Sequence, residues 1–188
     1  MPYVSLCIIT LTTEKLIDKF FILQVKEITM ADMLVNLLRL PPAEELYAEL
    51  QRKYDVHIRR AMTPDKFRIV EWVKEHSTLS AAGECDTCFS RIPVSCFIAT
   101  RGQNILGYAC YNATAPDFFG PTKVLEDEQG KGIGKALLLA SLHALRNEGY
   151  AYAIIGGVGP EVFYQKTVGA VLIDGSTPGI YKDFLPKL

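Results

Sequence analysis

The feature that most constrains the fold of this chain is a change of pattern within residues 122–149. The segment TKVL, from Thr122, has the short apolar character of a strand, and the glycine-rich segment QGKGIGKALL follows it. Apolar residues then recur at helical spacing until Gly149, where a glycine commonly ends a helix. The sequence therefore predicts a strand, a glycine-rich turn and a long amphipathic helix, whose apolar stripe consists of Ile133, Leu137, Leu138, Leu142 and Leu145.

The remaining chain alternates between short strands and helices without a regular repeat. Three helices are expected. The first begins at Thr63, which caps a turn containing Pro64, and the other two cover residues 81–89 and 160–169. Strands are expected at VHIRRA, SCFIAT, ILGYACYN and AYAIIGGV, and two more around VLI and GIYKDFL. This order predicts an α/β (α+β) domain, a mixed sheet with helices on both faces.

The first 55 residues are expected to form an N-terminal arm, and residues 56–188 the main domain. Within the arm, residues 31–54 have helical spacing that is interrupted by Pro41 and Pro42, so one or two helices are predicted there. Residues before Met30 are either a poorly packed extension or an extra strand and helix on the domain.

Composition excludes several classes of function. The 20 basic and 21 acidic residues give a net charge of -1, so we expect neither a nucleic-acid nor a membrane partner. The N-terminal residues lack the basic start of a secretory signal, which predicts a cytoplasmic protein. Cys85 and Cys88 form one CxxC pair, but no second pair follows at the spacing of a zinc site, so no metal is expected.

The glycine-rich segment has the properties of an anion site. The start of a helix has unpaired N–H groups and a partial positive charge. Gly130, Gly132 and Gly134 would let a diphosphate approach the backbone, while Lys131 and Lys135 add positive charge. The segment departs both from the Walker phosphate loop, GxxxxGK[ST], and from the dinucleotide fingerprint, GxGxxG.

Gln129, Gly132 and Gly134 instead form Q-x-x-G-x-G, and a second segment, PEVFYQKTVGA, lies beyond the next strand. With both segments the sequence resembles the GNAT superfamily of N-acetyltransferases, of bacterial type, from about Val56 to the C-terminus. The resemblance implies a mostly antiparallel sheet with a splayed central strand pair, here TKVL and AYAIIGG. It also implies that the glycine-rich segment binds the pyrophosphate of acetyl-CoA. The implied cofactor-binding residues are Val124 and Leu125 for the pantetheine arm and Gln129, Gly130, Lys131, Gly132, Ile133, Gly134 and Lys135 for the pyrophosphate.

The same resemblance implies catalytic residues. Tyr164 matches the general acid of the family, which protonates the departing thiolate. Asp117 is a candidate for the base that deprotonates the amine, or else a loop residue that caps a turn. Two positions depart from the usual pattern: Gln129 stands where many members have arginine, and GGVGP, from Gly156, lacks an asparagine that helps to hold pantetheine.

The activity implied is transfer of an acetyl group from acetyl-CoA to a primary amine of a small molecule, directly within a ternary complex. The alternatives are an acetyltransferase acting on proteins or peptides and a non-catalytic acyl-CoA sensor. The C-terminal segment GSTPGIYKDF is expected to border the acceptor. The chain could also form a homodimer. Four aromatic residues either line the acceptor site or belong to the core: Phe118, Phe119, Tyr108 and Tyr111.

Overall fold

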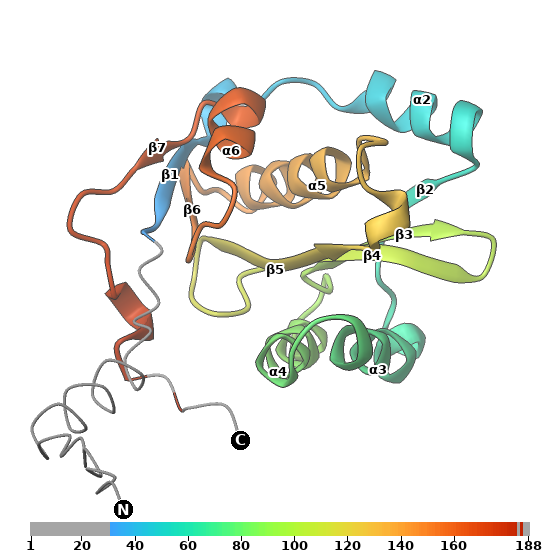
Figure 1. Cartoon of the computed structure of the whole chain (residues 1–188), viewed down its shortest axis with the longest axis horizontal. Coiled ribbons are helices and arrows are strands. Elements are labelled where there is room, and N and C mark those ends of the chain that lie inside the picture. Colours follow the sequence, from blue (N-terminus) through green and yellow to red (C-terminus); the bar gives the residue numbers. More distant parts are fainter. Residues whose placement is uncertain (1–30, 184, 186–188) are drawn as a thin grey trace, which may run out of the picture.

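The computed structural model of the protein describes residues 31–183 and 185. Its centre is a seven-stranded sheet in the order β2-β3-β4-β5-β6-β1-β7, shown in Figure 1. Every neighbouring pair is antiparallel except β5 and β6, which run parallel. The strands are β1 Met33–Asn36, β2 His57–Arg60, β3 Cys96–Arg101, β4 Asn104–Tyr111, β5 Phe118–Val124, β6 Tyr152–Ile155 and β7 Val171–Leu172.

The helices cover both faces of the sheet. The pair α3 (Lys66–His76) and α4 (Leu79–Thr87) lies on one face, whereas the long helix α5 (Ile133–Asn147) packs on the other (Figure 1). Helices α2 (Glu44–Tyr54) and α6 (Glu161–Val168) lie on the same side as α5. This arrangement confirms the predicted mixed α/β fold.

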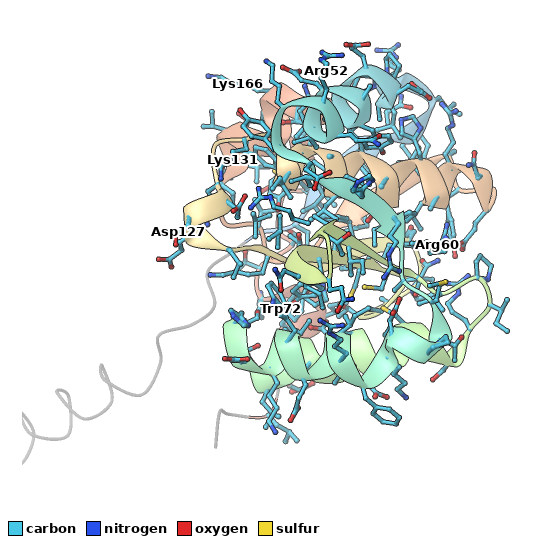
Figure 2. All side chains as sticks on the ribbon, turned by 90° about the vertical axis from the view of Figure 1, so that its right-hand side faces the viewer. Arg52, Arg60, Trp72, Asp127, Lys131 and Lys166 are labelled. Atoms are coloured by element: carbon cyan, nitrogen blue, oxygen red, sulfur yellow. The ribbon has the colours of Figure 1, made fainter. Side chains whose placement is uncertain are left out.

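Strand β4 separates two hydrophobic cores because its side chains alternate between the faces. Leu106, Ala109 and Tyr111 belong to the core beneath α5, whereas Tyr108 and Cys110 belong to the core beneath α3 and α4. In the second core Trp72 lies between α3 and the sheet, with its ring 6.1 Å from that of Tyr108 (Figure 2). Tyr108 and Tyr111 are fully buried, so both are core residues.

The parallel pair β5 and β6 diverges after a short contact. Phe118 pairs with Ile154 and Phe119 with Ile155, and these are the only pairs recorded between the strands in the described part of the chain. Beyond Phe119, β5 continues to Val124, whereas β6 ends at Ile155. The strands therefore splay, as the family resemblance implied, and β5 begins earlier than the expected Thr122.

Two sequence predictions of secondary structure are wrong. The segment predicted as helical from residue 31 contains strand β1, which pairs Val35 with Ala153 and belongs to the central sheet, while only Glu44–Tyr54 forms an α-helix. The strand expected at GIYKDFL is instead a short 3-10 turn over Gly179–Tyr181. The expected strand at VLI is present as β7.

The part of the arm that the structure describes packs on the main domain. Leu37 and Leu50 lie in the same core as α5, and Leu46 of α2 approaches Gly132. The predicted extension before Met30 lies outside the described residues. Within the described chain, no helix combines the length and the apolar character that crossing a membrane requires.

Candidate functional site

The first turn of α5 offers unpaired backbone donors. Gly132 precedes the helix with φ 93°, a left-handed conformation that favours glycine, and Gly130 has φ 77°. The first helical hydrogen bond runs from the Ala136 N–H to the Gly132 carbonyl over 3.0 Å. The N–H groups of Ile133, Gly134 and Lys135 therefore have no partner within the helix, and the helix dipole adds positive potential there.

These donors face a cleft of about 620 Å³ between α5, α6 and the divergent end of β5. Val124 presents its backbone to this cleft. The Leu125 N–H donates to the Leu106 carbonyl over 2.9 Å, so Val124 occupies a non-hydrogen-bonded position of the β4–β5 ladder and its N–H and C=O point toward the opposite edge. The residues that line the cleft include Val124, Gln129, Gly130, Gly132, Ile133, Gly134, Lys135, Phe163 and Tyr164.

An ion-pair network fixes the loop before α5. Arg101 donates to both oxygens of Glu128 over 2.8 and 2.9 Å, and the Lys131 ammonium lies 2.9 Å from the same carboxylate. These hydrogen bonds lower the pKa of Glu128 to about 2. Glu128 therefore compensates the charge of Lys131, while Lys135, which lines the cleft, has no ion-pair partner among the described residues.

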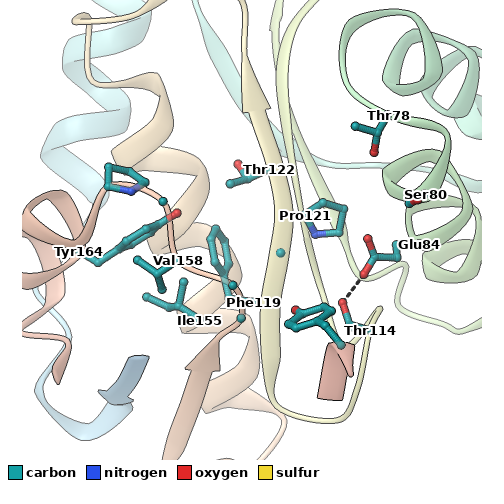
Figure 3. Close-up of a pocket in the computed structure, with 16 residues that line it drawn as sticks. Thr78, Ser80, Glu84, Thr114, Phe119, Pro121, Thr122, Ile155, Val158 and Tyr164 are labelled. Atoms are coloured by element: carbon teal, nitrogen blue, oxygen red, sulfur yellow. Dashed lines mark hydrogen bonds between the residues drawn. The ribbon is translucent and has the colours of Figure 1, made fainter. Parts of the chain in front are cut away.

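A second cavity of about 460 Å³ adjoins the cleft, and Figure 3 shows its lining. Both cavities are lined by Phe119, Thr122, Pro160 and Tyr164, so these residues form their junction. On the far wall, Thr78, Ser80 and Glu84 come from α4 and the residue before it, and Thr114 comes from the loop before β5 (Figure 3). Tyr164 is the only one of the four shared residues with an ionisable side chain.

Tyr164 lies on α6 and is 7% exposed. Its ring packs edge-on against Phe163 and Phe119, with centroids 5.0 and 6.4 Å away. Burial raises the pKa of the Tyr164 phenol above its ordinary value. The hydroxyl therefore remains protonated at neutral pH and can donate a proton to a basic group at the junction.

The structure brings most of the predicted site residues together. Tyr164 and seven of the predicted cofactor residues line the cleft: Val124, Gln129, Gly130, Gly132, Ile133, Gly134 and Lys135. Leu125 and Lys131 are not among its lining residues, because the Leu125 amide is used in the sheet and the Lys131 ammonium is held by Glu128.

Asp117 lies outside both cavities, at the start of β5. Its φ of 60° is left-handed, its N–H donates to the Asn112 side chain over 2.7 Å, and its carbonyl accepts from the Ile154 N–H over 3.0 Å. Burial raises the pKa of its carboxyl group. These backbone contacts match the alternative in which Asp117 shapes a turn.

Sequence reasoning did not single out Glu84 or Thr114, whereas it marked Gly156 as the start of the segment that lacks the asparagine. A Cβ at Gly156 would lie 2.3 Å from the Tyr181 hydroxyl and 2.9 Å from the Phe118 ring, so the glycine lets these two side chains pack closely against the backbone. Tyr181 lines the second cavity, which places the C-terminal segment beside it as expected, although as a turn.

Three cysteines that are distant in sequence meet in the core beneath α4. The sulfur atoms of Cys85, Cys96 and Cys110 lie within 4.8 Å of one another, and all three residues are buried. Sulfur donors of this kind suit Zn²⁺ or Cu⁺ better than Mg²⁺. None of the three lines either cavity, and the expected absence of a metal stays a prediction.

Comparison with known proteins places these features in context. Residues 44–164 match the model of the acetyltransferase (GNAT) family. No curated protein matches the sequence. A GCN5-related glucosamine N-acetyltransferase region of a fungal multi-domain GH3 β-N-acetylglucosaminidase is similar in structure, with a TM-score of 0.64 and 10% identity over 85% of this chain and 22% of that one.

A GCN5-related N-acetyltransferase from Sphaerobacter thermophilus is also similar, with a TM-score of 0.53 and 18% identity over 87% of this chain and 54% of that one. Both similarities concern the fold. The chain matches about a fifth of the first structure and about half of the second.

Proposed function

This chain belongs to the acetyltransferase (GNAT) family, and on that premise we propose that it transfers an acetyl group from acetyl-CoA to a primary amine of a small molecule. The observation that carries the proposal is the junction of two cavities at Tyr164. One cavity has the unpaired amides and the strand edge that suit acetyl-CoA, and the other, of about 460 Å³, has the size of a small-molecule site.

In this proposal the amides of Ile133, Gly134 and Lys135 bind the pyrophosphate, and Lys135 adds charge. The backbone of Val124 pairs with the pantetheine arm much as an added strand would. The Val124 carbonyl already accepts from Gln129 Nε2 over 3.3 Å, so Gln129 orients this edge. Leu125 and Lys131 support the loop without direct contact to acetyl-CoA.

The reaction is a direct transfer. The amine nitrogen attacks the thioester carbonyl carbon, the carbon–sulfur bond breaks, and the electron pair of that bond passes to sulfur. The Tyr164 hydroxyl then protonates the thiolate, and the proton that the nitrogen loses restores Tyr164 through solvent. We do not assign the base to Asp117, because it lies outside both cavities.

The small second cavity favours a small amine over a protein or peptide acceptor, which needs a groove for an extended chain. The alternative is a non-catalytic acyl-CoA sensor, and the test must distinguish it from an active acetyltransferase. The bacterial type, a cytoplasmic location and a homodimer remain predictions from the sequence.

The test is release of free thiol from acetyl-CoA across a panel of primary amines, with thermal unfolding measured in parallel. We expect amine-dependent thiol release. We also expect acetyl-CoA to stabilise the fold by about 2.7 kcal/mol when its concentration is about 100 times the dissociation constant. Stabilisation by acetyl-CoA without thiol release for any amine would identify a sensor. If acetyl-CoA caused no stabilisation and no amine caused thiol release, the proposal would be contradicted.

A further inference from the structure

Within the second cavity, one residue differs from all others in charge. The sixteen residues drawn in Figure 3 line it, and among them Glu84 is the only one with a formal charge at neutral pH. Much of the lining is apolar or glycine, including Phe119, Pro121, Ile155 and Val158. Glu84 is therefore the only charged side chain in the lining, while the Asp32 carboxylate lies outside it and accepts from the N–H of the lining residue Gly157 over 2.8 Å.

Thr114 holds Glu84 in position. The Thr114 hydroxyl donates to Glu84 Oε1, as the dashed line in Figure 3 marks, and this oxygen thus gains a neutral partner. In the part of the chain that the structure describes, no lysine, arginine or histidine forms an ion pair with Glu84. A half-buried carboxylate without a cation attracts one, since its desolvation is otherwise only partly compensated.

Glu84 and Tyr164 lie on opposite walls of the cavity. Figure 3 shows Tyr164 on the α6 side and Glu84 on the α4 side, with Pro121 between them. The acetylated nitrogen must lie at the junction, beside Tyr164, because that is where the two cavities meet. Glu84 is therefore placed to bind a different group, at the other end of the acceptor.

From this geometry we propose that the acceptor carries a second cationic group, which binds Glu84 while the first amine is acetylated. The apolar residues between the two walls suit a methylene spacer, so the substrate class is an α,ω-diamine or an amine with a distal guanidinium. This inference rests on the proposed function and specifies its acceptor. Glu84 acts here as a specificity residue.

The test compares primary amines of equal chain length that end in an ammonium, a hydroxyl or a carboxylate group. For each length, kcat/KM is measured with the full chain and with Glu84→Gln, which keeps the size of the side chain and an oxygen that can accept from Thr114. Glu71→Gln, an exposed position on α3, is the matched control for the change in net charge.

We expect the chain to prefer the ammonium-terminated amine over the hydroxyl-terminated one by about 10- to 100-fold, the value of a charge-assisted hydrogen bond. The carboxylate-terminated amine should be the poorest acceptor. Glu84→Gln should abolish this preference, mainly by raising KM for the diamine, whereas Glu71→Gln should retain it. Equal preference in the parent and in Glu84→Gln would overturn the inference.

A binding measurement keeps the inference testable if no amine is acetylated. Calorimetric titration of the same diamines into the protein saturated with coenzyme A reports binding without turnover. Diamine binding that Glu84→Gln weakens would support the inference even when the proposed activity fails. Diamine binding that is absent, or is unaffected by Glu84→Gln, would contradict it.

Discussion

Tyr164 connects the two cavities at the scale of a single residue. The Tyr164 ring is buried between Phe119 and Phe163. Tyr164 lines both the cleft beside α5 and the second cavity. Because burial raises the pKa of the phenol, the group stays protonated over the neutral pH range. A proton donor is therefore available where we place the thioester.

Tyr164→Phe removes this donor and little else. We expect turnover to fall by roughly 10²-fold, with the dissociation constant of acetyl-CoA nearly unchanged, because the hydroxyl acts on the leaving thiolate and not on the bound cofactor. Tyr152→Phe, at a half-exposed position on β6, is the matched control and should keep the full rate. A normal rate for Tyr164→Phe would remove the general-acid role.

Glu128 offers a prediction on pH. Its folded-state pKa of about 2 lies below the ordinary 4.5, so the folded protein binds fewer protons and the carboxylate stabilises it fully above pH 4.5. That contribution is lost as pH falls from 4.5 toward 2. We expect Glu128→Gln to be less stable than the parent at neutral pH, with the difference vanishing over this window in urea unfolding. A difference that is independent of pH would show that the ion pairs with Arg101 and Lys131 contribute nothing.

At the scale of elements, the start of α5 is where sequence and structure agree best. The glycines, the helix stripe and the strand before them are local features, and local spacing is sufficient to predict them. Strand β1 was missed because Leu34, Leu37 and Leu38 have helical spacing. What makes Met33–Asn36 a strand is pairing with β6 and β7, more than a hundred residues away in sequence, which no local pattern contains.

Local sequence patterns also fail to predict the parts of the site that depend on long-range contacts. Glu84 precedes the CxxC pair but belongs to no motif of its own, and only the fold places it beside Thr114 and opposite Tyr164. Cys96 and Cys110 likewise become neighbours only through the β3–β4 pairing. By contrast, the glycine-rich segment and Tyr164 could be marked as candidates, because one is a helix start and the other belongs to a motif within one helix, and the structure places both at one cleft.

Gly134→Ala separates cofactor binding from folding at the start of α5. Gly134 has no left-handed φ, and an added Cβ would lie 3.7 Å from a Val124 methyl group, an ordinary contact. We expect the free protein to gain up to about 1 kcal/mol of stability, as for other helical glycines. Coenzyme A binding, measured by calorimetry, should weaken about tenfold, because the methyl group would occupy the surface that the diphosphate contacts.

Gly83→Ala is the control for that prediction. Gly83 lies in α4 and lines neither cavity, and a Cβ there would meet nothing within 4 Å. This variant should gain similar stability in thermal unfolding and bind coenzyme A as the parent does. Unchanged binding by Gly134→Ala would indicate that the diphosphate lies elsewhere.

At the scale of the whole molecule, the splay of β5 and β6 organises the site. Because the strands separate after Phe119, the gap between them is open to the start of α5 on one side and to α4 on the other. The two cores hold the helices on opposite faces of the sheet, so in the proposed function the acetyl donor and the acceptor would approach Tyr164 from different directions.

The most direct test of this account is a crystal structure of the full chain with coenzyme A. We predict that the pyrophosphate accepts hydrogen bonds from the amides of Ile133, Gly134 and Lys135, that pantetheine pairs with Val124, and that the thiol lies beside the Tyr164 hydroxyl. Coenzyme A bound away from the first turn of α5, or a thiol remote from Tyr164, would contradict the account.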